Sequence, residues 1–578
     1  MADIRFSLLV AAHNFSFKSV QHVVETAKLN FKDSVIAKRI SQSRTKCTSI
    51  VKNVLSENIK DELSNELKNN VFSILVDESS DISNTRLMCI LVRYIDSNSE
   101  VKTQLLDLIP IGGDEGNAKG LYNLFKNSME RFKLSVDNVV GFCSDNASVM
   151  LGKKNSFKTH LVSENTEIIV NGCVCHSAHL VAVAASQEIP SYVEALIQNI
   201  YSYFSRSPKR QSILEEFQKF MHFSQLKILS PSKTRWLALS NCVNRVLQQW
   251  DVLVELFREA AFEDKNPVGN MIFSELQNPY VKAYLHFLNH VLPLINKFNA
   301  MFQSQKVSVQ DLYPESRRFI RVVAVNFIKP SFLSKDEKLD NLNIYDPNVL
   351  LSIEEVNVGE HTLETLKDCS ERDKEQFKLI CVKFYQKCVS DAYKRFPMNN
   401  LYKNMSFVIP KIALTPDTDK TCDLSELAEK YERKVDKYEV VKELNTLKVY
   451  FSETEKEKLL GSKNSVEFWS AIGEIKSFDD EYIFPNIAKL AKIILVLPHG
   501  NADVERVFSM MTDIKTKKRN RLNPETLSDL LRVKLDMQNK HHCCISYPIT
   551  ESHISKFGKC MYQFSNKDGV VESSDDEL

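Results

Sequence analysis

The sequence predicts a mixed α/β domain combined with a large all-helical region. Five short apolar runs, several of them rich in β-branched residues, lie between residues 71 and 175. Strand signals then largely vanish, and residues 240–480 show the spacing of successive amphipathic helices. Because 578 residues exceed what one hydrophobic core usually serves, we expect two or three domains.

Residues 1–69 are predicted to form a helical N-terminal segment, because apolar residues such as Val20, Val23 and Val24 recur there at helical spacing. Residues 70–236 carry the strand signals. The predicted strands are Val71–Asp77, Leu87–Ile95, Val101–Pro110, Val139–Cys143 and Ile168–Cys175. Short links between the first three predict an antiparallel meander, and helical patterns follow the third, fourth and fifth. This order is that of the RNase H-like fold.

The rest of the chain is predicted to be helical. Residues 237–480 form an all-α insertion, and residues 481–540 form three helices that can close a core or a dimer. The last of these carries Leu527, Leu530, Leu531 and Leu535, a stripe that one small subdomain is not expected to bury completely, so we expect self-association through it. Residues 541–578 are expected to be a poorly structured tail.

The composition is that of a folded protein, with 43% hydrophobic and 26% charged residues. No apolar stretch approaches the roughly 18 residues that a membrane span needs. The thirteen cysteines are scattered rather than arranged as a disulfide framework, which indicates the cytosol or the nucleus. The net charge of +1 leaves nucleic-acid binding open.

Two basic clusters are candidate sites of phosphate contact. One runs from Arg206 to Arg235. The other consists of Lys515, Lys517, Lys518, Arg519 and Arg521. A charge run is commonly only a solvated face, so the neighbouring residues have to decide between the two interpretations.

Two aspartates each close a buried strand, Asp77 after residues 71–76 and Asp145 after residues 139–144. An ionised carboxylate in such a place loses solvation unless it faces water, a cation or a metal. Ordinary turn and helix-capping chemistry is the simpler explanation for each aspartate alone. Glu505 is a third candidate, at the start of a helix whose apolar side is formed by other residues.

An ordered set of short motifs resembles those of hAT-superfamily DNA transposases. The motifs are Leu75-Val76-Asp77-Glu78-Ser79-Ser80-Asp81, Ser144-Asp145-Asn146-Ala147, Cys173-Val174-Cys175-His176, Thr234-Arg235-Trp236, Asn501-Ala502-Asp503-Val504-Glu505-Arg506-Val507-Phe508-Ser509 and Arg519-Asn520-Arg521-Leu522. Each motif alone is weak, but the ordered set is specific and reaches from the N-terminal helices to about Met537. The chain is similar in particular to the hAT derivatives described as zinc-finger MYM-type-like or SCAN-domain-like.

The resemblance implies that Asp77, Asp145 and Glu505 form a DDE triad that binds Mg²⁺ or Mn²⁺. Three carboxylates can hold two such ions about 4 Å apart, which suits attack on a phosphodiester by water or a 3′-hydroxyl. The resemblance also implies an RNase H-like catalytic core split by the helical insertion. In that arrangement Glu505 returns from the C-terminal side, and the last helices dimerise.

Other motif residues receive implied roles from the same resemblance. Trp236 would stack on a flipped base while Arg235 meets a nearby phosphate, although a tryptophan is as often a core anchor. Cys173 and His176 would be a structural feature near the active site. A zinc site that also used Cys175 and His179 is disfavoured, because ligands this close in sequence rarely wrap one tetrahedral ion. We assign no function to His541, His542, Cys543 and Cys544.

Two functions follow as hypotheses. The first is a nuclear, metal-dependent transposase-like nuclease or strand transferase that binds DNA and self-associates. The second is a domesticated, non-catalytic nuclear protein that uses the same scaffold for dimerisation and for DNA or chromatin binding. The complete acidic triad favours the first. The second is favoured because no BED-type zinc-finger array precedes Asp77, which indicates a truncated gene or lost targeting.

Overall fold

The computed structural model describes residues 1–231, 239–263, 267–304, 308–334, 339, 341–415, 423–559 and 561–562. The contacts divide the chain into two compact units. Residues 1–173 and 404–578 form one, called the sheet unit below, and residues 174–403 form the other, called the helical unit. No helix within the described ranges is both long and apolar enough to cross a membrane.

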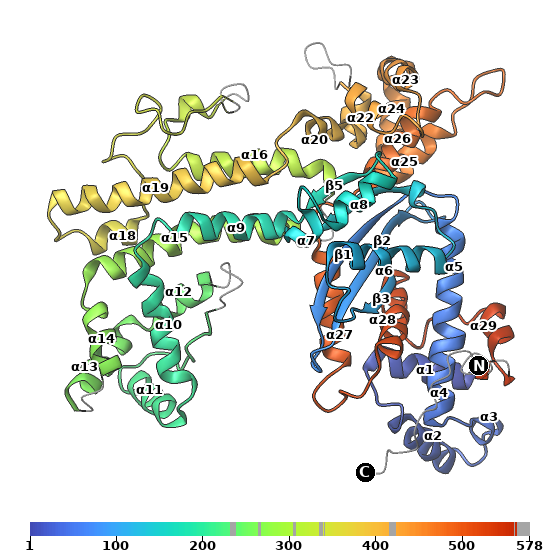
Figure 1. Ribbon diagram of the computed structural model, residues 1–578, viewed down its shortest axis with the longest axis horizontal. Helices are drawn as coiled ribbons and strands as arrows, with labels where there is room; N and C mark the ends of the chain where they lie inside the picture. Colours follow the sequence, from blue (N-terminus) through green and yellow to red (C-terminus); the bar gives the residue numbers. More distant parts are fainter. Residues whose placement is uncertain are drawn as a thin grey trace. The chain divides into compact units, whose positions relative to one another are not determined.

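The sheet unit is built on five strands in the order β3-β2-β1-β4-β5 (Figure 1). β1 (Phe72–Ser80), β2 (Arg86–Ile95) and β3 (Val101–Pro110) form the predicted antiparallel meander. β4 (Val139–Ser144) runs parallel beside β1, and β5 (Ile169–Gly172) runs parallel beside β4. The predicted mixed α/β class is therefore confirmed.

Both faces of the sheet are covered by helices, because successive residues of a strand point to opposite faces. Ile74 and Val76 belong to a core that includes residues of α6 (Ala118–Arg131) and α8 (Phe157–Glu164). Leu75 belongs to a second core, together with residues of α27 (Ala502–Ile514) and α28 (Pro524–Asn539). Asp77 lies two residues after Leu75, so it points to the face that α27 covers.

The N-terminal segment is helical and also packs on the second face. Its elements are α1 (Ala2–His13), α2 (Ser19–Asn30), α3 (Val35–Arg39), α4 (Arg44–Ile50), the π-helical turn η1 (Val51–Ser56) and α5 (Glu57–Leu67). Buried residues of α1, α4 and η1 share the second core with α28. The sheet unit is thus closed by residues from both ends of the described chain.

The sheet unit continues after the helical unit. Its further elements are η6 (Met405–Val408), α21 (Pro410–Leu414), α22 (Ser425–Lys430), α23 (Lys437–Tyr450), α24 (Glu453–Leu460), α25 (Ser465–Gly473), α26 (Pro485–Leu495), α27, α28 and α29 (Glu551–Lys556); two short elements in its first part are η2 (Val136–Asn138) and α7 (Ser148–Leu151).

The boundaries of the units differ from the predicted insertion, residues 237–480. Helices after residue 404 contact the sheet through hydrogen bonds to its backbone and loops. Tyr431 Oη donates to the carbonyl of Val140 at 3.0 Å, and Lys434 Nζ donates to the carbonyl of Asp137 at 2.9 Å. The amphipathic spacing of these helices predicted their existence but not the surface that they cover.

The helical unit consists of amphipathic helices and short links. Its helices are α9 (Val174–Ser186), α10 (Ser191–Ser205), α11 (Pro208–Phe220), α12 (Leu239–Gln248), α13 (Trp250–Glu263), α14 (Pro267–Leu276), α15 (Pro279–Phe302), η4 (Val309–Asp311), α16 (Leu312–Ala324), η5 (Pro330–Phe332), α18 (Glu360–Thr365), α19 (Glu371–Arg395) and most of α20 (Asn400–Asn404). Stacked rings join α15 to α19, as in the Tyr284–Phe377 pair with centroids 4.4 Å apart.

The leucine stripe of α28 is not an exposed surface, so the prediction that it mediates self-association is wrong. Leu527, Leu530 and Leu531 are at most 1% exposed and belong to the second core of the sheet unit. Arg532, also on α28, is 1% exposed and donates to the carbonyl of Leu106 in β3 at 2.6 Å. The stripe was predicted to be only partly buried because its periodicity does not reveal how much of the chain packs on it.

The close approach of β4 to the segment that precedes α27 makes a testable prediction. A Cβ atom at Gly141 would lie 2.4 Å from Ser73 Oγ and 2.7 Å from Leu497 Cδ2. Gly141→Ala should therefore lower the free energy of unfolding by about 1–3 kcal/mol, as overpacking usually does. Urea denaturation followed by circular dichroism measures this change.

Gly113→Ala is the matched control, because a Cβ at Gly113 has no neighbour within 4 Å. Its free energy of unfolding should stay within about 1 kcal/mol of the wild-type value. Equal stability of the two variants would contradict this packing of residue 497 on β4.

Candidate active site

Asp77 and Asp145 lie at corresponding positions of two adjacent parallel strands. Leu75 of β1 pairs with Cys143 of β4, and each aspartate follows two residues later. Neighbouring strands run about 4.8 Å apart, so strand pairing brings the two carboxyl groups together.

The N-terminus of α27 approaches Asp77 through Asn501. The side-chain Nδ2 of Asn501 donates to Asp77 Oδ2 at 3.0 Å, and its backbone N–H donates to Cys173 Sγ at 3.4 Å. Asn501 is 1% exposed, and its side chain makes no capping hydrogen bond to its own helix. The residue therefore ties α27 to β1 and to the residue that follows β5.

Glu505 lies in the first turn of α27 and is exposed. The pKa of Asp77 is raised to about 7. Burial is the largest cause, the charge of Asp145 is the next cause that raises it, and the charge of Glu505 adds a weaker effect. The three acidic residues predicted as a triad thus share one electrostatic neighbourhood.

Both aspartates also make the backbone contacts of ordinary turns. The N–H of Glu78 donates to Asp77 Oδ1 at 2.9 Å, and the N–H of Ala147 donates to Asp145 Oδ1 at 3.2 Å. The simpler turn interpretation of each aspartate therefore describes real contacts. It does not explain why two acidic strand ends meet a third acidic residue.

The donor chemistry of this cluster suits a hard divalent cation, because all three groups are carboxylates and hard cations prefer oxygen ligands. A cation would also relieve the repulsion that raises the pKa of Asp77. In this structure the three side chains are not arranged as the ligands of one metal ion. Across the part of the chain that the structure describes, no group of three or more His, Cys, Asp or Glu residues is arranged to hold a metal ion.

Asp503 is a further acidic residue on α27, two positions before Glu505. It forms an ion pair with Arg506, three residues later on the same helix. Arg506 therefore neutralises Asp503 in this structure.

Cys173 and His176 lie in different units. Cys173 is buried after β5, where it accepts the hydrogen bond from Asn501 and its own N–H donates to the carbonyl of Ser144 at 2.9 Å. His176 lies in α9 of the helical unit. Arg235 and Trp236 lie outside the described residues.

The basic segment after α27 divides into structural and exposed residues. Lys515 is 4% exposed and forms an ion pair of 2.7 Å with the buried Asp81, which corrects its assignment as a phosphate contact. Arg519 is partly buried, donates to the carbonyl of Asn14 at 3.3 Å and lies over the ring of Phe17. Lys517, Lys518 and Arg521 are exposed and remain the candidates for phosphate contact.

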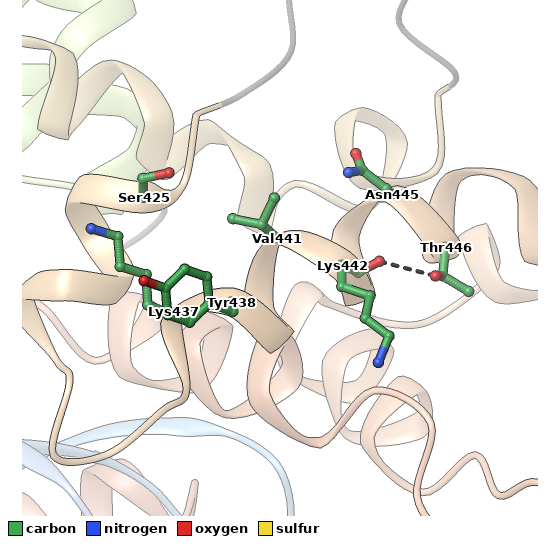
Figure 2. Close-up of a pocket in the computed structure, with 7 residues that line it drawn as sticks. All are labelled: Ser425, Lys437, Tyr438, Val441, Lys442, Asn445 and Thr446. Carbon is green, nitrogen blue, oxygen red and sulfur yellow. Dashed lines mark hydrogen bonds between the residues drawn. The ribbon is translucent and has the colours of Figure 1, made fainter.

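A pocket on α22 and α23 is separate from the acidic cluster (Figure 2). It is lined by Ser425, Lys437, Tyr438, Val441, Lys442, Asn445 and Thr446. Its two lysines are paired with acidic residues, Lys437 with Glu429 at 2.6 Å and Lys442 with Glu439 at 3.0 Å. None of its lining residues is a carboxylate, and none belongs to the predicted triad.

Asn501 is a residue of this site that sequence reasoning did not identify. Its position before an acidic helix start gave no sign that its amide would contact Asp77. A hydrogen bond between residues so far apart in sequence cannot be read from local spacing.

The raised pKa of Asp77 predicts how stability depends on pH. Between about pH 4 and pH 7 the folded protein keeps a proton on Asp77 that the unfolded chain has lost. Asp77 therefore favours the folded state most in acid, where it is protonated in both states, and this contribution to the free energy of unfolding is lost as the pH rises through about 7. Asp77→Asn should therefore raise the thermal midpoint relative to wild type more at pH 8 than at pH 5, in EDTA.

Asp114→Asn, which removes an exposed carboxylate of the same unit, controls for the loss of one negative charge. A wild-type-to-variant difference for Asp77→Asn that is the same at both pH values would show that Asp77 is not strained electrostatically.

Comparison with known families bears on the assignment. Residues 12–156 match the family described as ZMYM1/FAM200, RNase-like domain, a stretch that contains Asp77 and Asp145. Residues 446–537 match the family described as hAT family C-terminal dimerisation region, which contains Glu505 and supports self-association. Together the two matches confirm the predicted resemblance to hAT-derived, transposase-like proteins in these two stretches, one similar to an RNase-like domain and the other to the hAT dimerisation region.

Proposed function

We propose that this protein cleaves DNA and transfers DNA strands in a metal-dependent reaction at Asp77, Asp145 and Glu505. The observation that carries the proposal is the electrostatic meeting of the three carboxylates at Asp77, whose pKa is raised by burial, by Asp145 and by Glu505. A buried carboxyl group whose pKa is raised by neighbouring carboxylates is a common feature of functional sites.

The proposal includes an RNase H-like catalytic core that the helical unit interrupts. Two observations support it. The sheet unit is made of residues 1–173 and 404–578, which precede and follow the helical unit in the sequence. Asp77 and Asp145 come from the first part, and Glu505 comes from the second.

Each residue has a distinct part in the proposed reaction. Asp77, Asp145 and Glu505 would hold Mg²⁺ or Mn²⁺, and such ions activate an attacking hydroxyl and stabilise the leaving oxygen of a phosphodiester. Asn501 orients Asp77 through its hydrogen bond to Oδ2. Lys517, Lys518 and Arg521 attract the DNA backbone, and Arg235 and Trp236 engage the DNA near the cut. A chromosomal substrate places the protein in the nucleus.

A second candidate function is a non-catalytic nuclear protein that dimerises and binds DNA or chromatin. The observation that favours it is the arrangement of the acidic side chains, which do not form a group of three metal ligands among the described residues. Under this alternative Asp77 and Asp145 serve the turn contacts at Glu78 and Ala147, and Asp77 also holds Asn501.

Cleavage of DNA by triad variants separates the two functions. Glu505→Gln and Asp145→Asn should each reduce single-turnover cleavage in Mg²⁺ by at least about 100-fold, because each removes charge where the phosphodiester reacts. Duplex affinity should change little. Isothermal titration with Mn²⁺ should show weaker metal binding by both variants.

Asp503→Asn is the matched control, since Asp503 lies two residues before Glu505 and is paired with Arg506. It should retain most cleavage. Wild-type protein that binds duplex DNA without Mn²⁺ binding or cleavage would support the non-catalytic alternative and contradict the proposed reaction.

DNA affinity should depend on the exposed lysines of the basic segment. The double variant Lys517→Gln/Lys518→Gln should weaken binding to all duplexes alike. It should also reduce the slope of log affinity against log salt by about 2, because each phosphate contact contributes about 0.9. Fluorescence anisotropy over a series of salt concentrations measures both effects.

The control is Lys32→Gln/Lys38→Gln, which neutralises two exposed lysines of the same unit at and near α3. The salt slope of this control should equal that of wild type. An unchanged slope for the 517/518 variant would remove this segment from the DNA-binding surface.

A further inference from the structure

A short hairpin joins α25 to α26 and carries an aromatic side chain at its tip. Ser477 N–H donates to the carbonyl of Glu481 at 2.8 Å, and Ile483 N–H donates to that of Ile475 at 2.9 Å. Asp480 adopts a left-handed conformation with φ of 63° in the turn. Figure 1 draws this connection as a loop that projects from the orange helices. We call it the 475–483 hairpin.

The two aromatic residues of the hairpin are exposed. Phe478 at the tip is fully exposed, at 111%, and Tyr482 on the returning strand is 50% exposed. An ion pair of 3.0 Å between Lys476 and Asp480 stabilises the turn. The hairpin is therefore held by its own hydrogen bonds and charges, while the side chain at its tip stays exposed among the residues that the structure describes.

The exposed apolar surface continues at the base of the hairpin. Tyr450, in the last turn of α23, contacts the buried ring of Phe484 edge to face, with centroids 5.4 Å apart. Val449 beside it is 74% exposed. Phe484 directly follows the hairpin, so Val449 and Tyr450 lie where the hairpin leaves the helices. An ordered surface of exposed apolar residues usually marks a site of association.

The partner that fits this surface is a second copy of the chain. All four exposed residues fall within residues 446–537, the match to a dimerisation region. The leucine stripe of α28 in the same region offers little surface, because Leu527, Leu530 and Leu531 are buried and the partly buried Leu535 packs against the same core. The hairpin also carries both signs of charge, Lys476 beside Asp479 and Glu481, so two copies of it can meet without repelling each other by net charge.

We propose that two copies of this chain associate through the 475–483 hairpin, with Phe478 at its tip and Val449, Tyr450 and Tyr482 along its side. The proposal rests on the self-association that the dimerisation region supports. It names the surface that performs it.

Sedimentation velocity of the full chain over a series of concentrations tests this surface. Phe478→Ser should raise the dimer dissociation constant at least 10-fold, and Phe478→Leu should restore most of the association. Because Phe478 is fully exposed, neither substitution should alter the thermal midpoint of unfolding or the circular dichroism spectrum.

Phe220→Ser is the matched control, since Phe220 is 83% exposed but lies in the helical unit. It should leave the dissociation constant unchanged. Wild-type protein that is monomeric at every concentration would overturn self-association itself. A wild-type dimer that is unaffected by Phe478→Ser, or that Phe220→Ser dissociates instead, would overturn only the assignment of the hairpin.

Discussion

The structure of the sheet unit depends on covering the second face of its sheet. The helices α6 and α8, close in sequence to the strands, cover the first face with a core around Phe125, Phe142 and Phe157. The other face, to which Leu75, Leu91 and Leu105 point, takes its cover from outside the stretch that contains the strands, within the described residues. The ends of the chain supply it, through α1 and η1 on one side and α27 and α28 on the other.

This constraint also assembles the candidate site. Asp77 points to the face that α27 must cover, so docking of the helix brings Asn501 into hydrogen-bond contact with its carboxylate. The far end of the same helix is held by Lys515, whose buried ion pair with Asp81 reaches the turn after β1. Removing one partner of such a buried pair usually destabilises strongly, because it leaves the other charge unpaired. Contacts at both of its ends thus hold α27 against β1, and the position of Glu505 relative to Asp77 follows from them.

If the proposed association surface is used, the C-terminal region serves two purposes in one chain. Its α27 and α28 complete the core of the sheet unit, and most apolar residues of α28 are buried in that core. Exposed apolar residues remain on the segment around α23, α25 and α26, where the 475–483 hairpin leaves the helices. Separation of folding and association surfaces within one region is what a folded protomer requires, since a side chain buried in its own core cannot also contact a partner.

The sequence by itself determined the elements and the chemistry of the candidate residues. Short apolar runs rich in β-branched residues indicated the five strands, and helical spacing of apolar residues indicated most of the helices. Acidic residues at two strand ends and one helix start, read with the resemblance, indicated Asp77, Asp145 and Glu505. Only the tertiary structure decided which surface covers which. In the tertiary structure the helices after residue 404 belong to the sheet unit, and Leu527, Leu530 and Leu531 are buried. Lys515 is paired with Asp81 instead of lying on the basic surface, and Asn501 donates a hydrogen bond to Asp77. The physical reason is that local periodicity records that a face must be buried, whereas its partner is chosen by packing between segments that are distant in the chain.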